Sequence, residues 1–155
     1  MQAQQGDAGQ FDALLANVEK SVQDALAYFE GPGATSQVKV DQWGPRDVLC
    51  HFLFWHQATA EGMESVARGG QPTRLEASTD DMNARAIAQH ARESIPQLVS
   101  QARQLQGRLV RAARSIRDLE KPVLVRFDGT PANLRQRLEI IARHWTNHVR
   151  DLRMG

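Results

Sequence analysis

The sequence has only one cysteine in 155 residues, and this scarcity excludes any internal disulfide. A reduced, cytoplasmic protein is the natural prediction for such a chain. The segment Met1–Gln10 lacks both a basic start and an apolar run, so no signal peptide is expected. The densest apolar run, Val48–Trp55, is short and interrupted by His51, so no membrane span is expected either. The length fits a single domain over residues 1–155, which needs no disulfide to bury a core.

The chain also lacks a large net charge, although its charges are unevenly distributed. The formal net charge is +1, yet residues 1–80 carry 5 basic and 11 acidic groups, whereas residues 81–155 carry 14 and 7. Such asymmetry can mark a surface for anions or nucleic acid. However, no arm, finger or aromatic-plus-basic RNA motif accompanies the basic residues. Several arginines instead share one side of a helical wheel: Arg103, Arg111, Arg114 and Arg117. We interpret them as the solvated face of a helix and expect no nucleic-acid partner.

Apolar residues recur at helical spacing in the first half of the chain. The stripe Phe11–Phe29 predicts a helix with Asp7 as its N-cap, Gln10 in a capping box and an end near Glu30. A second helix is predicted to follow Trp43, with a proline in its first turn, and to stop at a Gly-Gly-Gln-Pro segment.

The middle of the chain predicts a third helix. Ser78 or Thr79 can cap it, and its apolar stripe continues to Leu119. Pro96 lies inside this pattern and removes a backbone donor, so we expect a kink or a restart near Ser94.

The pattern changes before the last helix. Apolar residues alternate over residues 123–127 ahead of an Asp-Gly pair, which predicts an extended segment and a turn. Thr130 as N-cap and Pro131 as the first helical residue then predict a fourth helix through Leu152. Four amphipathic helices without sustained heptads or internal repeats indicate an all-α protein, a single four-helix bundle.

The five histidines carry the chemical signal of the sequence. His144 and His148 are four residues apart, so their imidazoles lie on one side of the last helix, as two ligands of one metal ion would. One packed and one solvated histidine is the alternative for such a pair. His51 lies in an apolar stretch and is directed toward the interior, where an unpaired imidazole costs about 1–3 kcal/mol. Its partner is either a metal shared with the pair or a carbonyl or carboxylate. His56 and His90 are interpreted as structural or exposed.

Several catalytic motifs are missing. His144 and His148 have the outer spacing of the zincin signature, but no glutamate follows the first histidine, so a metalloprotease is excluded. The sequence has no glycine-rich phosphate loop, no nucleophile elbow and no cysteine pair. Cys50 points away from Val48 on the helical wheel and is interpreted as a small packing residue.

The order of these features resembles the DinB-like (DinB/YfiT) metal-binding four-helix superfamily. This superfamily includes bacillithiol and mycothiol S-transferases, the N-terminal domain of mycothiol-dependent maleylpyruvate isomerase, and the ClbS/DfsB group. The resemblance spans nearly the whole chain and rests on these residues: Trp43–His51, Asn83, Gly129–Pro131, His144, His148 and Asp151–Arg153.

The resemblance implies that His51, His144 and His148 hold a divalent metal, zinc or nickel, with open coordination positions. Three neutral imidazoles leave the charge of the dication uncompensated, which favours a deprotonated ligand near neutral pH. The implied activity is a thiol-dependent S-transferase or isomerase, with a low-molecular-weight thiol and a small electrophile as partners. One alternative is a metal-dependent hydrolase, for which Asp47 and Glu139 are candidate bases or ordinary capping and surface charges. The other is a non-enzymatic protein that binds or sequesters a small molecule, as in resistance.

Three aromatic residues bear on the site and on assembly. Trp55 and Trp145 lie close in sequence to the candidate ligands and would either line an apolar pocket or pack in the core. Phe54 lies away from the inner stripe of its helix, and many members of the family that the sequence resembles pair as dimers. We therefore expect a homodimer, which sedimentation at micromolar concentrations can test.

Overall fold

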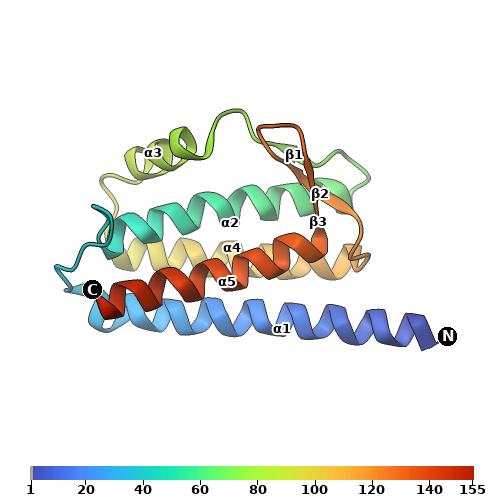
Figure 1. The fold of residues 1–155 in the computed structure, drawn as a ribbon, viewed down its shortest axis with the longest axis horizontal. Helices are drawn as coiled ribbons and strands as arrows, with labels where there is room; N and C mark the ends of the chain where they lie inside the picture. Colours follow the sequence, from blue (N-terminus) through green and yellow to red (C-terminus); the bar gives the residue numbers. More distant parts are fainter. Residues whose placement is uncertain (1) are drawn as a thin grey trace.

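The computed structural model describes residues 2–155, with side chains from residue 8 onward. This part of the chain is mostly helical, with five α-helices and a small three-stranded sheet. The helices are α1 (Gln2–Glu30), α2 (Pro45–Ala67), α3 (Thr79–Gln89), α4 (Ile95–Ile116) and α5 (Leu134–Met154), and the strands are β1 (Thr73–Arg74), β2 (Pro122–Val125) and β3 (Pro131–Asn133). The four long helices lie side by side, and α3 and the sheet lie along the outer side of α2 (Figure 1).

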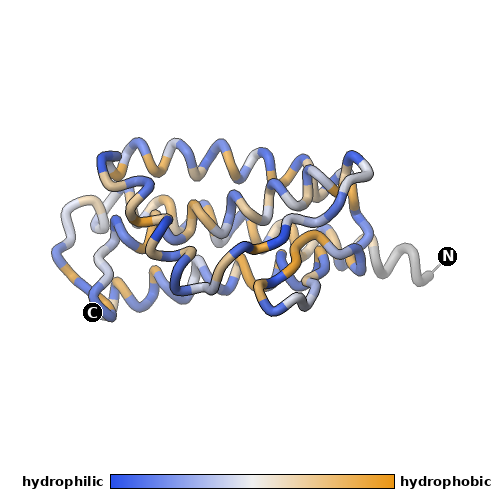
Figure 2. The backbone as a smooth tube through the Cα atoms, turned by 90° about the horizontal axis from the view of Figure 1, so that it is seen from above, coloured by the Kyte–Doolittle hydropathy of each residue, from blue (hydrophilic) through white to orange (hydrophobic). Residues whose placement is uncertain are grey.

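The predicted apolar stripes form the core between the long helices. Each long helix contributes residues with no exposed surface: Val18, Phe29, Leu49, Leu98, Leu109 and Leu138. Hydrophobic and hydrophilic residues alternate along the helices, as amphipathic helices require (Figure 2). Among the described helices, none combines the length and the apolar character needed to cross a bilayer.

The predicted start of the first helix is wrong. The helix begins at Gln2, before the predicted N-cap Asp7, so Gln10 does not belong to a capping box. Glutamine and alanine, which dominate residues 2–5, are strong helix formers, and nothing there ends the helix. The side chain of Asp7 lies outside the described part of the chain.

The predicted interruption near Ser94 is confirmed, and it divides the third helix into α3 and α4. The Ser78 hydroxyl caps α3 by accepting from the N–H of Asp81, and the Ser94 hydroxyl caps α4 by accepting from the N–H of Gln97. Pro96 lies in the first turn of α4, where its missing N–H costs no helical hydrogen bond. The proline therefore starts a helix instead of bending one.

The predicted start of the last helix is also wrong. Thr130 is not an N-cap but part of a turn, in which its N–H and hydroxyl donate to Asp128 Oδ1 at 2.9 and 2.7 Å. Pro131 opens β3, which pairs antiparallel with β2, because the extended segment satisfies its backbone groups through this pairing. Asn133 is the actual N-cap, accepting from the N–H of Gln136 at 2.8 Å.

The sheet packs closely on α2, and its first strand was not predicted. β1 pairs parallel with β2, with Thr73 opposite Leu124. A Cβ atom added at Gly62 of α2 would lie 2.1 Å from the carbonyl oxygen of Val123, so only glycine permits this approach. Phe54 packs against a small apolar cluster that includes Leu124. This contact within the chain accounts for the position of Phe54, and the homodimer stays a prediction.

The uneven charge has a structural explanation at the contact between α1 and α4. Arginines of the basic half pair with acidic residues of α1: Arg103 with Glu30, Arg114 with Glu19 and Arg117 with Asp12. Each arginine side chain is more than half exposed, which agrees with the predicted solvated face. Such exposed pairs contribute little to stability.

A single arginine anchors the junction between α3 and α4 to the start of α2. Arg46 Nε and Nη2 donate to the carbonyl oxygen of Glu93 at 3.0 and 2.7 Å, and Nη2 also donates to the carbonyl oxygen of His90. These carbonyl groups belong to the segment that joins α3 to α4. The bonds fix α3 beside the first turns of α2.

Candidate metal centre

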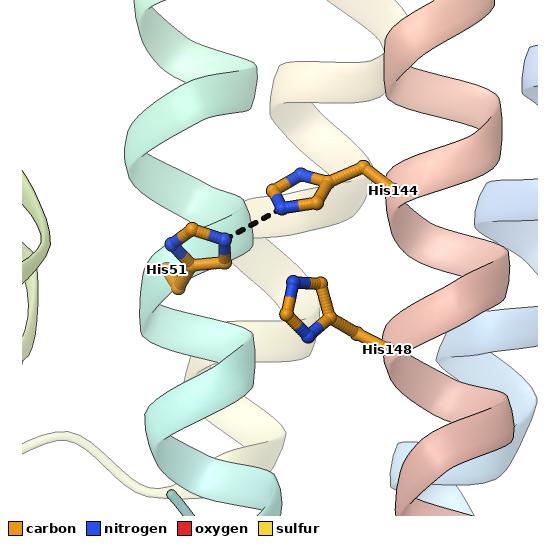
Figure 3. A group of neighbouring side chains, drawn as sticks. All are labelled: His51, His144 and His148. Atoms are coloured by element: carbon orange, nitrogen blue, oxygen red, sulfur yellow. Dashed lines mark hydrogen bonds between the residues drawn. The ribbon is translucent and has the colours of Figure 1, made fainter. Parts of the chain in front are cut away.

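Three histidines from two helices meet between α2 and α5 (Figure 3). His51 comes from α2, and His144 and His148 come from successive turns of α5. One nitrogen from each ring lies within 4.8 Å of the others, a cluster that could hold a metal ion. The helices are held together beside the cluster by Phe52 and Trp145, whose rings stack with centroids 4.1 Å apart. The sequence pattern thus selected residues that the fold brings together.

The cluster is closed on one side and open on the other. His51 is 5% exposed, while His144 and His148 are only partly buried. The Nε2 atoms of His51 and His144 are 2.7 Å apart, and the dashed line in Figure 3 marks this contact. A proton shared between the two nitrogens accounts for this contact, and a divalent ion would replace that proton when both act as ligands. The partial exposure leaves room for a further ligand.

Burial keeps the three imidazoles neutral. Loss of solvation lowers the pKa of His51 to about 4 and that of His144 to about 3, and the neighbouring histidines add to both shifts. Burial also lowers the pKa of His148, although Asp151 opposes this shift. Since a metal binds only the neutral imidazole, protons compete weakly for this site near neutral pH.

Asn83 of α3 fixes which nitrogen of His51 faces the cluster. The indole Nε1–H of Trp55 donates to Asn83 Oδ1 at 3.0 Å, which identifies this atom as the amide oxygen, because indole is only a donor. His51 Nδ1 lies 2.7 Å from the same oxygen and must therefore carry the proton. The lone pair of the neutral ring is then on Nε2, directed at His144. Histidines that bind a metal through one ring nitrogen typically donate the N–H of the other nitrogen to an acceptor of this kind.

Replacing Asn83 with alanine is expected to weaken metal binding by about 10- to 100-fold, because the tautomer and ring orientation of His51 are no longer fixed. Asn83→Asp retains an oxygen acceptor and is the matched control, with a smaller loss. Competition against a chromophoric chelator measures the affinity, and ¹⁵N chemical shifts of His51 report its tautomer. Unchanged affinity and tautomer in Asn83→Ala would show that the amide has no positioning role.

The other two histidines are structural, as predicted. His56 is buried, and its Nε2 lies 2.7 Å from Gln106 Oε1. Burial lowers the pKa of His56 to about 4, so the ring is neutral. The Nδ1 of His90 donates to Glu93 Oε2 at 3.0 Å. Neither ring belongs to the metal-type cluster found among the described residues.

The remaining candidates for chemistry, among the described residues, lie outside the histidine cluster. Cys50 is fully buried, and burial raises the pKa of its thiol to about 11, which disfavours the reactive thiolate. Asp47 caps α2 by accepting from the N–H of Gly44 at 3.2 Å. Glu139 is exposed on α5, and Trp145 is buried in the core. Within the described part of the chain, neither candidate carboxylate joins the histidine cluster.

A cavity of about 280 Å³ adjoins the histidines. His51 and His144 form part of its wall, together with two arginines and a mostly apolar lining. Trp55 also lines the cavity, which agrees with the first of the two alternatives for this residue, a pocket wall and not core packing. The other lining residues are Leu75, Ala77, Thr79, Leu124, Arg126, Phe127, Arg137, Ile140 and Ile141. A small molecule in this cavity would lie against the open side of the cluster.

Comparisons with protein-family profiles, curated proteins and solved structures gave no match for this chain. Three neutral imidazoles beside a mostly apolar cavity are therefore the features that bear on the function.

Proposed function

We propose that this protein is a metal-dependent, DinB-like four-helix-bundle enzyme that joins a low-molecular-weight thiol to a small electrophile, or uses the thiol to isomerise it. The observation that carries the proposal is the cluster of His51, His144 and His148, of which His51 and His144 line a cavity. The donor set fits zinc or nickel, since both accept neutral imidazole. A dication held there would favour the deprotonated form of a thiol near neutral pH.

The chain's own residues would prepare this reaction in three ways. Asn83 orients His51, so that the lone pair of its Nε2 atom would be available to an ion held by the cluster. Trp55 and the apolar wall exclude water from the electrophile. Cys50 is buried and protonated, so the nucleophile must be an external thiol. In a transfer, the thiol loses its proton to solvent, sulfur forms a bond to carbon, and the leaving group departs with the electron pair.

Thiol consumption by the metal-loaded protein tests this proposal. Protein reconstituted with Zn²⁺ or Ni²⁺ is mixed with cysteine, glutathione, bacillithiol or mycothiol and a chromogenic aryl halide. We expect thioether formation above the uncatalysed rate with at least one thiol, and its loss after chelation or in His144→Ala.

Two other outcomes would contradict the proposed transferase. Hydrolysis without any thiol would indicate a hydrolase, although no carboxylate base joins the histidines among the described residues. Stoichiometric binding without turnover would indicate a sequestering protein. The cytoplasmic location and the homodimer are further predictions that this assay does not test.

A further inference from the structure

Arg137 of α5 is a buried cation without an acidic partner. It is 7% exposed, and its Nε and Nη2 atoms both donate to the hydroxyl of Thr59, at 3.2 and 2.8 Å. Across residues 8–155, no carboxylate lies within ion-pair distance of it. Buried charges in proteins are normally paired, because removing an isolated ion from water is costly. The missing counter-charge therefore has to be explained.

The position of Arg137 indicates where that counter-charge would come from. Arg137 lines the cavity beside the histidines and lies two helical turns before His144, on the same side of α5. Arg126 lines the same cavity, and no aspartate or glutamate among residues 8–155 does. Burial, assisted by Arg126, lowers the pKa of Arg137 to about 10, which still leaves the guanidinium charged at neutral pH.

The hydrogen bonds of Arg137 leave one edge of the guanidinium free. Thr59 accepts from Nε and from Nη2, and Nη1 has no partner among the described side chains. Both N–H groups of Nη1 and the second of Nη2 are therefore available. Two parallel N–H groups match the two oxygens of a carboxylate, which is the geometry that distinguishes arginine from lysine.

We propose that Arg137 binds a carboxylate on the substrate, so that the protein acts on small electrophiles composed of a carboxylate and an apolar body. The apolar body would contact Trp55, Leu124 and Ile141, which line the same cavity. The carboxylate at Arg137 would leave the other end of the molecule toward His51 and His144. The assignment of that other end as the reactive one rests on the proposed function, whereas binding of the carboxylate can be tested alone.

Binding of benzoate and of its uncharged analogue benzamide tests the carboxylate site. Both are titrated into chelator-treated protein, in which no metal can bind the carboxylate, and the Trp55 indole N–H signal is followed by NMR. We expect benzoate to bind at least tenfold more tightly than benzamide. Arg137→Gln should reduce benzoate affinity by about 10- to 100-fold, as expected for loss of a charge-assisted hydrogen bond.

Arg135→Gln is the matched control, because Arg135 lies on the same helix but pairs with Glu120 and does not line the cavity. It should leave benzoate binding unchanged. The comparison of benzoate with benzamide in the unsubstituted protein remains decisive even if Arg137→Gln does not fold. Equal binding of the two compounds, no binding of benzoate at millimolar concentration, or tighter binding of inorganic phosphate would overturn the proposal. A failed turnover assay with intact benzoate binding would instead count only against the thiol chemistry.

Discussion

Alanine at His51, His144 or His148 is expected to remove metal from the purified protein, which elemental analysis measures directly. A dication held by two imidazoles loses a coordination bond that water replaces poorly at a site of fixed geometry. The loss should exceed the 10- to 100-fold expected at Asn83, because a ligand is removed instead of a group that orients it. All three nitrogens lie within 4.8 Å of one another, so we expect each substitution to have a comparable effect.

The same variants should lose the stabilisation that metal gives to the native state. Free metal at about 100 times its dissociation constant stabilises the native state by about 2.7 kcal/mol, so chelation should lower the melting temperature of the unsubstituted protein. In the three variants, chelation should have no effect. His90→Ala and His56→Ala are the controls, because their rings bond to Glu93 and Gln106 outside the cluster. Full metal occupancy in His51→Ala would reject the three-ligand site and leave at most a pair on α5.

Replacing Gly62 with alanine is expected to destabilise the fold by about 3 kcal/mol or more, at or beyond the upper end for overpacked cores. The new Cβ would lie 2.1 Å from the carbonyl oxygen of Val123, far inside van der Waals contact. The obstacle is backbone of the sheet, so no side-chain rotation can relieve it, and α2 and β2 must separate. Urea denaturation monitored by circular dichroism measures the change in the free energy of unfolding.

Gly107→Ala is the matched control for this substitution. Gly107 also lies inside a long helix, α4, but the nearest atom to its added Cβ is the flexible end of Arg111, at 3.4 Å. This variant should be stabilised by about 0.5–1 kcal/mol, because alanine is the better helix former. Equal stability of Gly62→Ala and the unsubstituted protein would mean that β2 does not contact α2 this closely in solution.

The helices were predictable wherever local sequence decides the structure. The stripe from Phe11 to Phe29 and the interruption marked by Pro96 depend on neighbouring residues, and both appear in the structure. Strand β1 depends on pairing with β2, some fifty residues later in the chain, which no local pattern contains. The start of α5 depends on the antiparallel pairing of β3 with β2 across a turn. Pro131 fits the first turn of a helix and the first position of a strand equally well. The pairing of β3 with β2 makes Pro131 the first residue of a strand.

The candidate site was predictable only in part for a similar reason. His144 and His148 share a helix, so their spacing places them together, and the apolar surroundings of His51 pointed it inward. The role of Asn83 could not be derived, because it depends on how α3 packs against α2. Arg137 carried a signal that was overlooked: it lies seven residues before His144, hence on the same side of the helix. A charged residue beside the predicted ligands was reason to expect a charged substrate.

The way α3 is attached has a consequence for the lifetime of a bound ion. Only Met82 and Ala86 of this helix are buried, and the guanidinium of Arg46 ties its C-cap and the segment that follows to α2. An element with so little buried apolar surface unfolds locally at a lower free energy than the long helices, and its amide protons exchange with solvent sooner. Each local opening of α3 withdraws Asn83 from His51 while the core stays folded. A bound ion would therefore be held more weakly during each opening of α3, because the tautomer of His51 is then no longer fixed.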